Sequence, residues 1–248
     1  MSAGVTSPIG LKSSDRGILI GASRTGKSTL ANELLRLFHV EYPGCRRLIL
    51  DTKPRWRAAR LPTGQTTRRY YRDFVKGDTV EGSMLLKDPR DWQLVWDQDV
   101  NPAQAVVVQN HNLSDRANMQ LQLWAAEKFF RSVKADVPSL IYFDEGMDFF
   151  NVSGGAVGHS DIVQRCFRAG GEKGLTSLVG VQRPKGINPQ LLTETSWCAL
   201  FRIQFTEDVK RLWEMGWPRD APVPTFDQPH AFRLWKGAPE APLYRLAA

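Results

Sequence analysis

With 248 residues, the chain is long enough to bury one substantial core, so a single main domain is expected. Its net charge of +7 and pI near 9.5 favour an anionic partner. The longest apolar runs have only the length of strands and no signal-peptide stretch opens the chain, so we expect no membrane span and a cytoplasmic location. The three cysteines form no CxxC pair, which argues against a zinc site.

The first predicted elements surround a glycine-rich segment. Residues 1–15 are rich in serine and glycine and are expected to form a flexible arm. An apolar run at residues 17–21 predicts a short buried strand, and apolar residues with helical spacing predict a helix over residues 27–40. Between them, the segment from Gly21 to Ser28 matches GxxxxGK[ST] at every position.

This segment predicts a phosphate-binding loop. Its glycines let the backbone curl so that successive N–H groups point at phosphate oxygens, and the following helix adds its positive N-terminal end. Lys27 is expected to reach the β- and γ-phosphates, and the Ser28 hydroxyl to ligate Mg²⁺, which makes ATP and Mg²⁺ the predicted cofactors. The predicted nucleotide-binding residues are Gly21, Ala22, Ser23, Arg24, Thr25, Gly26, Lys27, Ser28 and Thr29.

A basic stretch accompanies the second predicted strand, residues 47–51. Nine basic residues and one acid lie between Arg46 and Arg72, with three aromatic residues among them. Arginines beside aromatics suit a phosphate backbone and can stack on bases, so this stretch is a candidate contact for a nucleic acid. The DNA-binding candidates are Arg68, Arg69 and Arg72, and the alternative is a solvated surface loop.

The middle of the chain continues the alternation of strands and helices. Residues 105–109 predict a third strand, residues 114–134 a helix, and residues 139–144 a fourth strand; residues 175–181 and 198–205 continue the series. Strands that are apolar throughout and alternate with helices predict an α/β fold, with a mostly parallel sheet covered by helices on both faces.

Two acids follow the fourth predicted strand. Asp144 and Glu145 should lie at the sheet edge where the strands end, which is where ligands bind in open α/β folds. Asp144 is expected to hold Mg²⁺, directly or through water, and Glu145 to orient and deprotonate the attacking water. A small-molecule kinase does not need the second acid, so the pair predicts an ATPase. The glycine-rich run in residues 146–160 is a second candidate for substrate contact.

After these motifs, the strand ending in Gln182-Arg183-Pro184 completes a resemblance to the FtsK/HerA superfamily of DNA-pumping ATPases. The second strand with Asp51-Thr52-Lys53-Pro54, and the basic stretch at residues 165–174, are similar to the family over roughly residues 16–215. The resemblance implies a RecA-like ASCE core and a homo-oligomeric ring, hexameric or pentameric. It also implies that Gln182 senses the γ-phosphate and that Arg165 or Arg168 is an arginine finger acting on the next subunit.

The C-terminal part sets the expected domain organisation. Prolines crowd residues 217–248, where residues 230–235 alone predict a strand, so this tail is expected to pack on the ATPase domain of residues 16–216 or on a neighbouring subunit. A bare motor domain with a short tail resembles the genome-packaging ATPases of tailless viruses. That reading implies capsid or portal-vertex partners in the host cytoplasm or virion. The alternatives are a cellular or plasmid DNA translocase or transfer ATPase, and an ATP-dependent switch or assembly protein that does not translocate.

Overall fold

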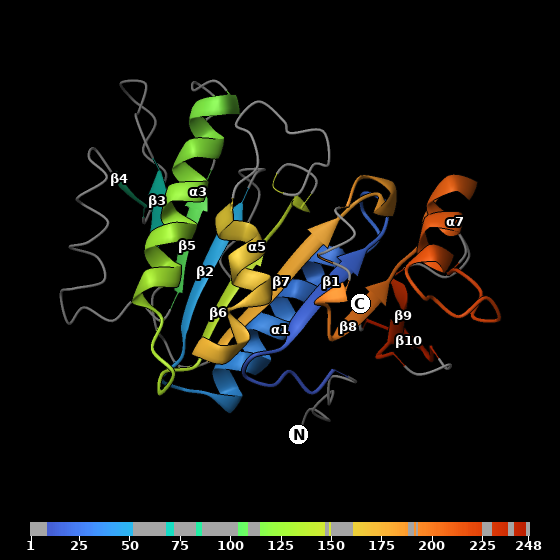
Figure 1. Cartoon of the computed structure of the whole chain (residues 1–248), viewed down its shortest axis with the longest axis horizontal. Coiled ribbons are helices and arrows are strands. Elements are labelled where there is room, and N and C mark those ends of the chain that lie inside the picture. The colour runs from blue at the N-terminus through green and yellow to red at the C-terminus, as the bar shows by residue number, and fades with distance from the viewer. Residues whose placement is uncertain are drawn as a thin grey trace.

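A mostly parallel sheet forms the centre of the computed structural model (Figure 1). The strand order is β10-β9-β8-β1-β7-β6-β2-β5-β3-β4. The strands are β1 (Arg16–Ile20), β2 (Arg46–Asp51), β3 (Arg68–Tyr71), β4 (Ser83–Leu85), β5 (Gln104–Val108), β6 (Ser139–Phe143), β7 (Leu175–Val181), β8 (Trp197–Leu200), β9 (Ala231–Trp235) and β10 (Leu243–Arg245). The structure describes residues 9–51, 68–71, 83–85, 104–108, 115–146, 149, 161–187, 191, 193–224, 230–237 and 241–246.

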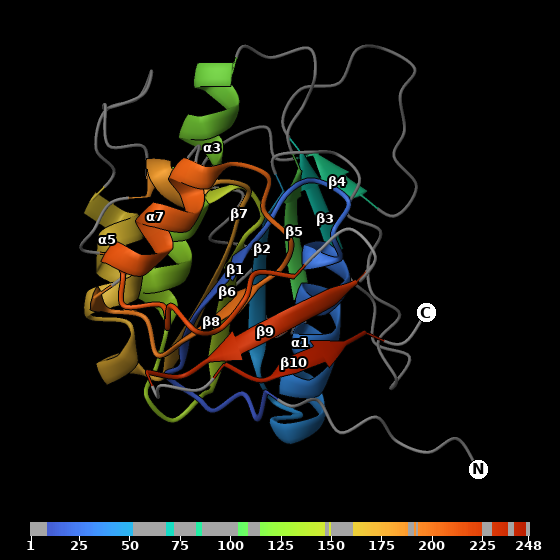
Figure 2. The same ribbon diagram turned by 90° about the vertical axis from the view of Figure 1, so that its right-hand side faces the viewer.

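Helices cover both faces of the sheet. They are α1 (Lys27–Glu41), α3 (Asp115–Ser132), α5 (Asp161–Arg168) and α7 (Thr206–Glu214), with short 3-10 turns η1 (Gly171–Lys173) and η2 (Pro184–Gly186). Figure 2 shows α1 on one face and α3, α5 and α7 on the other. All pairings among β1 to β8 are parallel, and β9 and β10 are antiparallel. The predicted α/β fold with a mostly parallel, two-sided sheet is confirmed.

The alternation of side chains along the strands divides the core into two layers. Ile18, Ile141 and Val179 belong to the layer under α3 and α5, whereas Leu140 and Leu178 belong to the layer under α1. Successive strand residues point to opposite faces, so the central strands are buried at nearly every position and are mostly apolar, with Ser139, Thr176 and Ser177 as buried polar exceptions. Burial on both faces is the reason that apolar runs predicted the central strands.

The chain ends pack onto this framework. In the second half of the expected flexible arm, Ile9 and Leu11 are buried and the Ser14 N–H donates to the Thr176 hydroxyl. At the other end, β9 pairs with β8, so the tail extends the main sheet as well as packing on it. In the described parts of the chain, no helix is both long and apolar enough to cross a bilayer.

Strand order places β7 between β1, which leads into the phosphate-binding loop, and β6, which leads into the two acids. In the parallel pairings, Ile20 is level with Val181 and Phe143 with Val179. The residues that follow these three strands therefore emerge side by side at one edge of the sheet, which we call the carboxyl edge. The opposite edge, where the strands begin, we call the amino edge.

Candidate active site

The phosphate-binding loop begins between the ends of two neighbouring strands. The Gly21 N–H donates to the Val181 carbonyl at 3.0 Å, and the Ala22 N–H donates to the Arg202 carbonyl at 2.9 Å. A Cβ at Gly21 would lie 2.5 Å from the Cβ of Phe201, so only glycine fits here. Gly26, with φ of 109°, has the left-handed conformation that favours glycine. The geometry of the loop thus explains why glycine occupies both of these positions in the motif.

Lys27 is folded back over the loop that precedes it. Its side chain is buried, and its ammonium donates to the carbonyls of Gly21 at 2.5 Å and Ala22 at 2.8 Å. The hydroxyl of Thr25 donates to the same Ala22 carbonyl at 2.8 Å. These contacts hold one cation at the N-terminus of α1, where helix and ammonium together favour an anion.

Asp144 is oriented by a residue of the strand that precedes it. The Tyr142 hydroxyl donates to Asp144 Oδ1 at 3.1 Å. Tyr142 points into the layer under α1, so this contact brings Asp144 to the face of the sheet that carries the phosphate-binding loop. Gly180 makes room for the pair, because a Cβ there would lie 2.8 Å from the Tyr142 hydroxyl oxygen.

Glu145 meets the residue that follows the adjacent strand. The Gln182 side-chain amide donates to Glu145 Oε1 at 2.7 Å, a charge-assisted hydrogen bond across the carboxyl edge. The contact exists because β7 pairs in parallel with β6, so the ends of the two strands are neighbours. The structure therefore places Gln182 against Glu145 at the same edge of the sheet as the phosphate-binding loop, while the roles of these residues remain predictions.

The residues predicted to hold Mg²⁺ are chemically suited to it. Ser28 is the second residue of α1 and Asp144 follows β6, and both supply the hard oxygen ligands that Mg²⁺ prefers. Protein Mg²⁺ sites commonly use one or two such groups and complete the shell with substrate phosphates and water. Within the described residues, no cluster of three or more His, Cys, Asp or Glu side chains could hold a metal ion.

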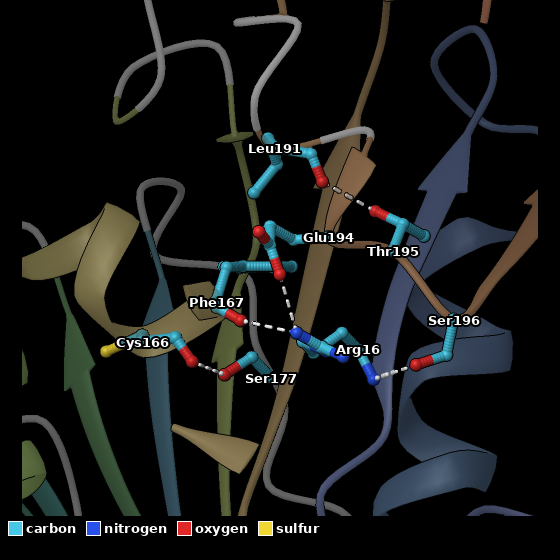
Figure 3. A network of polar contacts seen from close by, with 8 residues as sticks. All are labelled: Arg16, Cys166, Phe167, Ser177, Leu191, Glu194, Thr195 and Ser196. Atoms are coloured by element: carbon cyan, nitrogen blue, oxygen red, sulfur yellow. Dashed lines mark hydrogen bonds and ion pairs between the residues drawn. The ribbon is translucent and has the colours of Figure 1, made fainter. Parts of the chain in front are cut away.

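The two candidate arginine fingers lie away from this site. Both belong to the C-terminal end of α5, which lies at the amino edge. There the guanidinium of Arg16, the first residue of β1, donates to the Phe167 carbonyl at 3.1 Å and pairs with Glu194 at 2.8 Å (Figure 3). Arg165 pairs with Glu127 at 3.4 Å, and its guanidinium lies 4.9 Å from the centre of the Phe130 ring. Arg168 is exposed and has no hydrogen-bond or ion-pair partner among the described residues.

Part of the candidate DNA-binding stretch belongs to the core of the fold. The Arg47 side chain is fully buried and donates to the Leu35 carbonyl, and burial lowers its pKa from the usual value. Arg46 donates to the carbonyl and hydroxyl oxygens of Ser132. The number of basic residues in this stretch is therefore larger than the number of basic side chains that a nucleic acid could contact. The backbone of Arg68 and Arg69 lies in β3, and Arg72 lies outside the described residues.

Three contacts of the site were not predicted. Tyr142 could have been found, because it lies two residues before Asp144 and so shares its face of the strand. His230 and Leu246 could not, because no local pattern links them to the loop: a Cβ at Gly26 would lie 3.3 Å from His230 Nδ1 and 3.2 Å from Leu246 Cδ1. The C-terminal tail thus packs directly against the phosphate-binding loop.

No protein-family profile matches the chain, and no curated protein matches its sequence. Solved structures do match. The genome-packaging NTPase B204 from Sulfolobus turreted icosahedral virus 2, in complex with ATP-gammaS, has a TM-score of 0.61 at 11% identity and covers 96% of this chain and 100% of its own. B204 from Sulfolobus turreted icosahedral virus, a DNA-packaging ATPase, has a TM-score of 0.58 at 13% identity with the same coverage.

A third similar structure is EssC (ATPases 2 and 3) from Geobacillus thermodenitrificans, with a TM-score of 0.52 at 14% identity, covering 93% of this chain and 39% of that one. At such identities the comparisons speak for the fold. The chain therefore has the fold of the P-loop ATPases, in the form seen in these packaging ATPases and in EssC.

Proposed function

We propose that the protein is an Mg²⁺-dependent ATPase that translocates double-stranded DNA and packages a viral genome, working as a homo-oligomeric ring. The hydrogen bond between Gln182 and Glu145 carries the ATPase proposal, because it brings a candidate γ-phosphate sensor and a candidate base together beside the phosphate-binding loop. The packaging proposal is supported by the likeness to B204, which extends over nearly the whole length of both chains.

In the proposed reaction, the backbone N–H groups of the loop and the Lys27 ammonium bind the phosphates of ATP. Ser28 and Asp144 would hold Mg²⁺, which neutralises charge on the phosphate oxygens when it is bound. Glu145 takes a proton from the attacking water, the water oxygen bonds to the γ-phosphorus, and the bond to the ADP oxygen breaks. The products are ADP and inorganic phosphate, and the Gln182 amide keeps the Glu145 carboxylate in place.

The proposed partners are duplex DNA, further copies of the chain and proteins of a capsid or portal vertex, in a host cytoplasm or virion. Replacing Arg68, Arg69 and Arg72 together by Ala should weaken sequence-independent binding to duplex DNA. Each phosphate contact contributes about −0.9 to the log–log slope of affinity against salt, so the slope should flatten by up to about three units. DNA stimulation of ATP hydrolysis should fall while basal hydrolysis persists, which titrations and ATPase assays over a salt series would measure.

A control with the same change of charge is the replacement by Ala of the exposed lysines Lys12, Lys134 and Lys236, which lie on other parts of the surface. This variant should keep the parental slope. If the arginine variant also kept the parental slope and DNA stimulation, the stretch would be a solvated surface and the DNA contact would have to be sought in residues 146–160. A parent whose ATPase does not respond to DNA would favour the non-translocating switch.

Within one chain, Arg168 is too far from the nucleotide site to act on it. The amino and carboxyl edges are separated by the length of β7, which for seven residues is roughly 20 Å. Arg165 is further engaged by Glu127, whereas Arg168 extends from the last turn of α5 into solvent. We therefore propose Arg168 as the finger that acts on the ATP of a neighbouring subunit, with Arg165 the second candidate.

Arg168→Ala should bind ATP as the parent does and hydrolyse it poorly even when assembled. Mixing this variant with Glu145→Gln should restore part of the activity, because some interfaces then pair an intact finger with an intact base. The measurement is the ATPase rate of verified mixed assemblies over a range of subunit ratios.

Arg131→Ala is the matched control, since Arg131 is exposed in the last turn of the neighbouring helix α3 and should leave the rate unchanged. If both single variants were inactive and verified mixtures recovered nothing, Arg168 would not act between subunits. The same experiment on Arg165→Ala would then test the second candidate.

A further inference from the structure

The Gln182 amide can hold Glu145 only if the backbone at the end of β7 is itself held. Gln182 is the first residue after the strand, and its side chain crosses to the end of the neighbouring strand to make the 2.7 Å hydrogen bond. A shift of the backbone by about 1 Å would lengthen that bond beyond the usual range of hydrogen-bond distances. A residue that holds the backbone next to Gln182 would therefore also help to hold the candidate base in position.

The next residue, Arg183, is anchored on the opposite face of the sheet. Its backbone is extended, with φ of −136° and ψ of 123°, so its side chain and that of Gln182 point to opposite faces. The Arg183 guanidinium donates through Nε to Asp208 Oδ2 at 3.1 Å, in the first turn of α7. It also lies 4.3 Å from the centre of the Phe205 ring, a cation–π contact.

The anchor is buried on the carboxylate side and half-exposed on the arginine side, where the Arg183 side chain is 44% exposed. The Asp208 side chain is 1% exposed, and among the described residues Arg183 is the one cation paired with it. Its other oxygen, Oδ1, is buried without a hydrogen-bond partner in the described structure, so the carboxylate depends on the arginine. Nearby, Lys185 and Glu207 form a second pair between η2 and α7 at 2.5 Å, but both side chains are largely exposed.

We propose that Arg183 is a positioning residue for ATP hydrolysis: its anchor on Asp208 and Phe205 fixes the end of β7, so that Gln182 holds the Glu145 carboxylate where it can accept the proton of water. This inference rests on the proposed ATPase activity. It makes α7, which carries none of the sequence motifs for nucleotide binding, part of the support of the catalytic base.

The position of the anchor predicts which kinetic constant changes. Arg183 points away from the face that carries the phosphate-binding loop, so it contributes to the placement of the base and not to nucleotide binding. Arg183→Ala should lower kcat by about 10-fold, about 1.4 kcal/mol in barrier, and leave KM for ATP within about twofold of the parent. Steady-state ATPase assays with a thermal melt of each variant give both constants and the fraction folded.

A double-mutant cycle with Gln182→Ala separates positioning from a general loss of structure. If Arg183 acts through Gln182, the double variant Gln182→Ala/Arg183→Ala should be no slower than Gln182→Ala alone, because the contact that Arg183 supports is already lost. Additive losses in kcat would overturn the proposal. So would a parental kcat in Arg183→Ala, or a raised KM with kcat preserved.

Arg183→Ala leaves a buried carboxylate without its cation and could fail to fold. The variant Arg183→Ala/Asp208→Asn removes that charge as well and should show the same fall in kcat at parental KM in a folded protein. Lys185→Ala is the matched control, since it breaks the exposed pair between the same two elements, and it should keep the parental kcat. A parent without ATPase activity would reject the proposed function and this inference together, whereas an active parent with additive losses would reject the inference alone.

Discussion

Lys27→Ala should bind ATP at least about 100-fold more weakly than the parent, a loss of about 2.7 kcal/mol. The change removes the cation at the start of α1, and hydrogen bonds to a charged partner contribute about 1.5–3 kcal/mol each. It also removes the two hydrogen bonds through which Lys27 holds the carbonyls of Gly21 and Ala22, so the loop itself becomes less ordered. Calorimetric titration with ATP and Mg²⁺ would measure the loss.

Lys134→Ala is the control for this experiment. Lys134 is exposed in the turn between α3 and β6, at the amino edge, so the variant has the same charge as Lys27→Ala without touching the loop. It should bind ATP as the parent does. An affinity of Lys27→Ala within threefold of the parent would show that the loop does not bind phosphate through this lysine.

Glu145→Gln should bind ATP with parental affinity and hydrolyse it about 10²–10⁴-fold more slowly, the usual contribution of a positioned general base. The substitution keeps the size of the side chain and leaves an oxygen that can still accept the hydrogen bond from the Gln182 amide, so the loss isolates the carboxylate. Single-turnover hydrolysis, with binding measured on the same preparation, would separate the two effects.

The matched control is Glu172→Gln, because Glu172 is exposed in η1 at the amino edge. It should hydrolyse ATP at the parental rate. If Glu145→Gln hydrolysed ATP within about threefold of the parent, a barrier difference below roughly 0.7 kcal/mol, Glu145 would not be the base. Taken with Lys27→Ala, the two variants should show separable defects, one in binding and one in chemistry.

Local patterns were sufficient where one segment carries all the information that a feature requires. The loop from Gly21 to Ser28 needs its glycines, lysine and hydroxyl in one turn, and the structure gives each glycine a steric reason. Strands β1, β2, β5, β6 and β7 were predicted to within one residue because both faces are covered and most positions are apolar, whereas the strand predicted over residues 198–205 ends at Leu200. Composition alone counts Arg47 among the basic residues of the stretch from Arg46, although its side chain is buried under α1.

The sequence by itself determined the α/β class, because strand and helix patterns alternate along the chain. It also determined the phosphate-binding loop and the two acids at a strand end, because each of these lies within one short segment. Only the tertiary structure decided which strand ends are neighbours. Strand order brings Gln182 against Glu145, 37 residues away. The packing of α7 and of the C-terminal tail brings Asp208 to Arg183 and His230 to Gly26. These contacts join residues that are distant in the chain, so no single segment specifies their geometry.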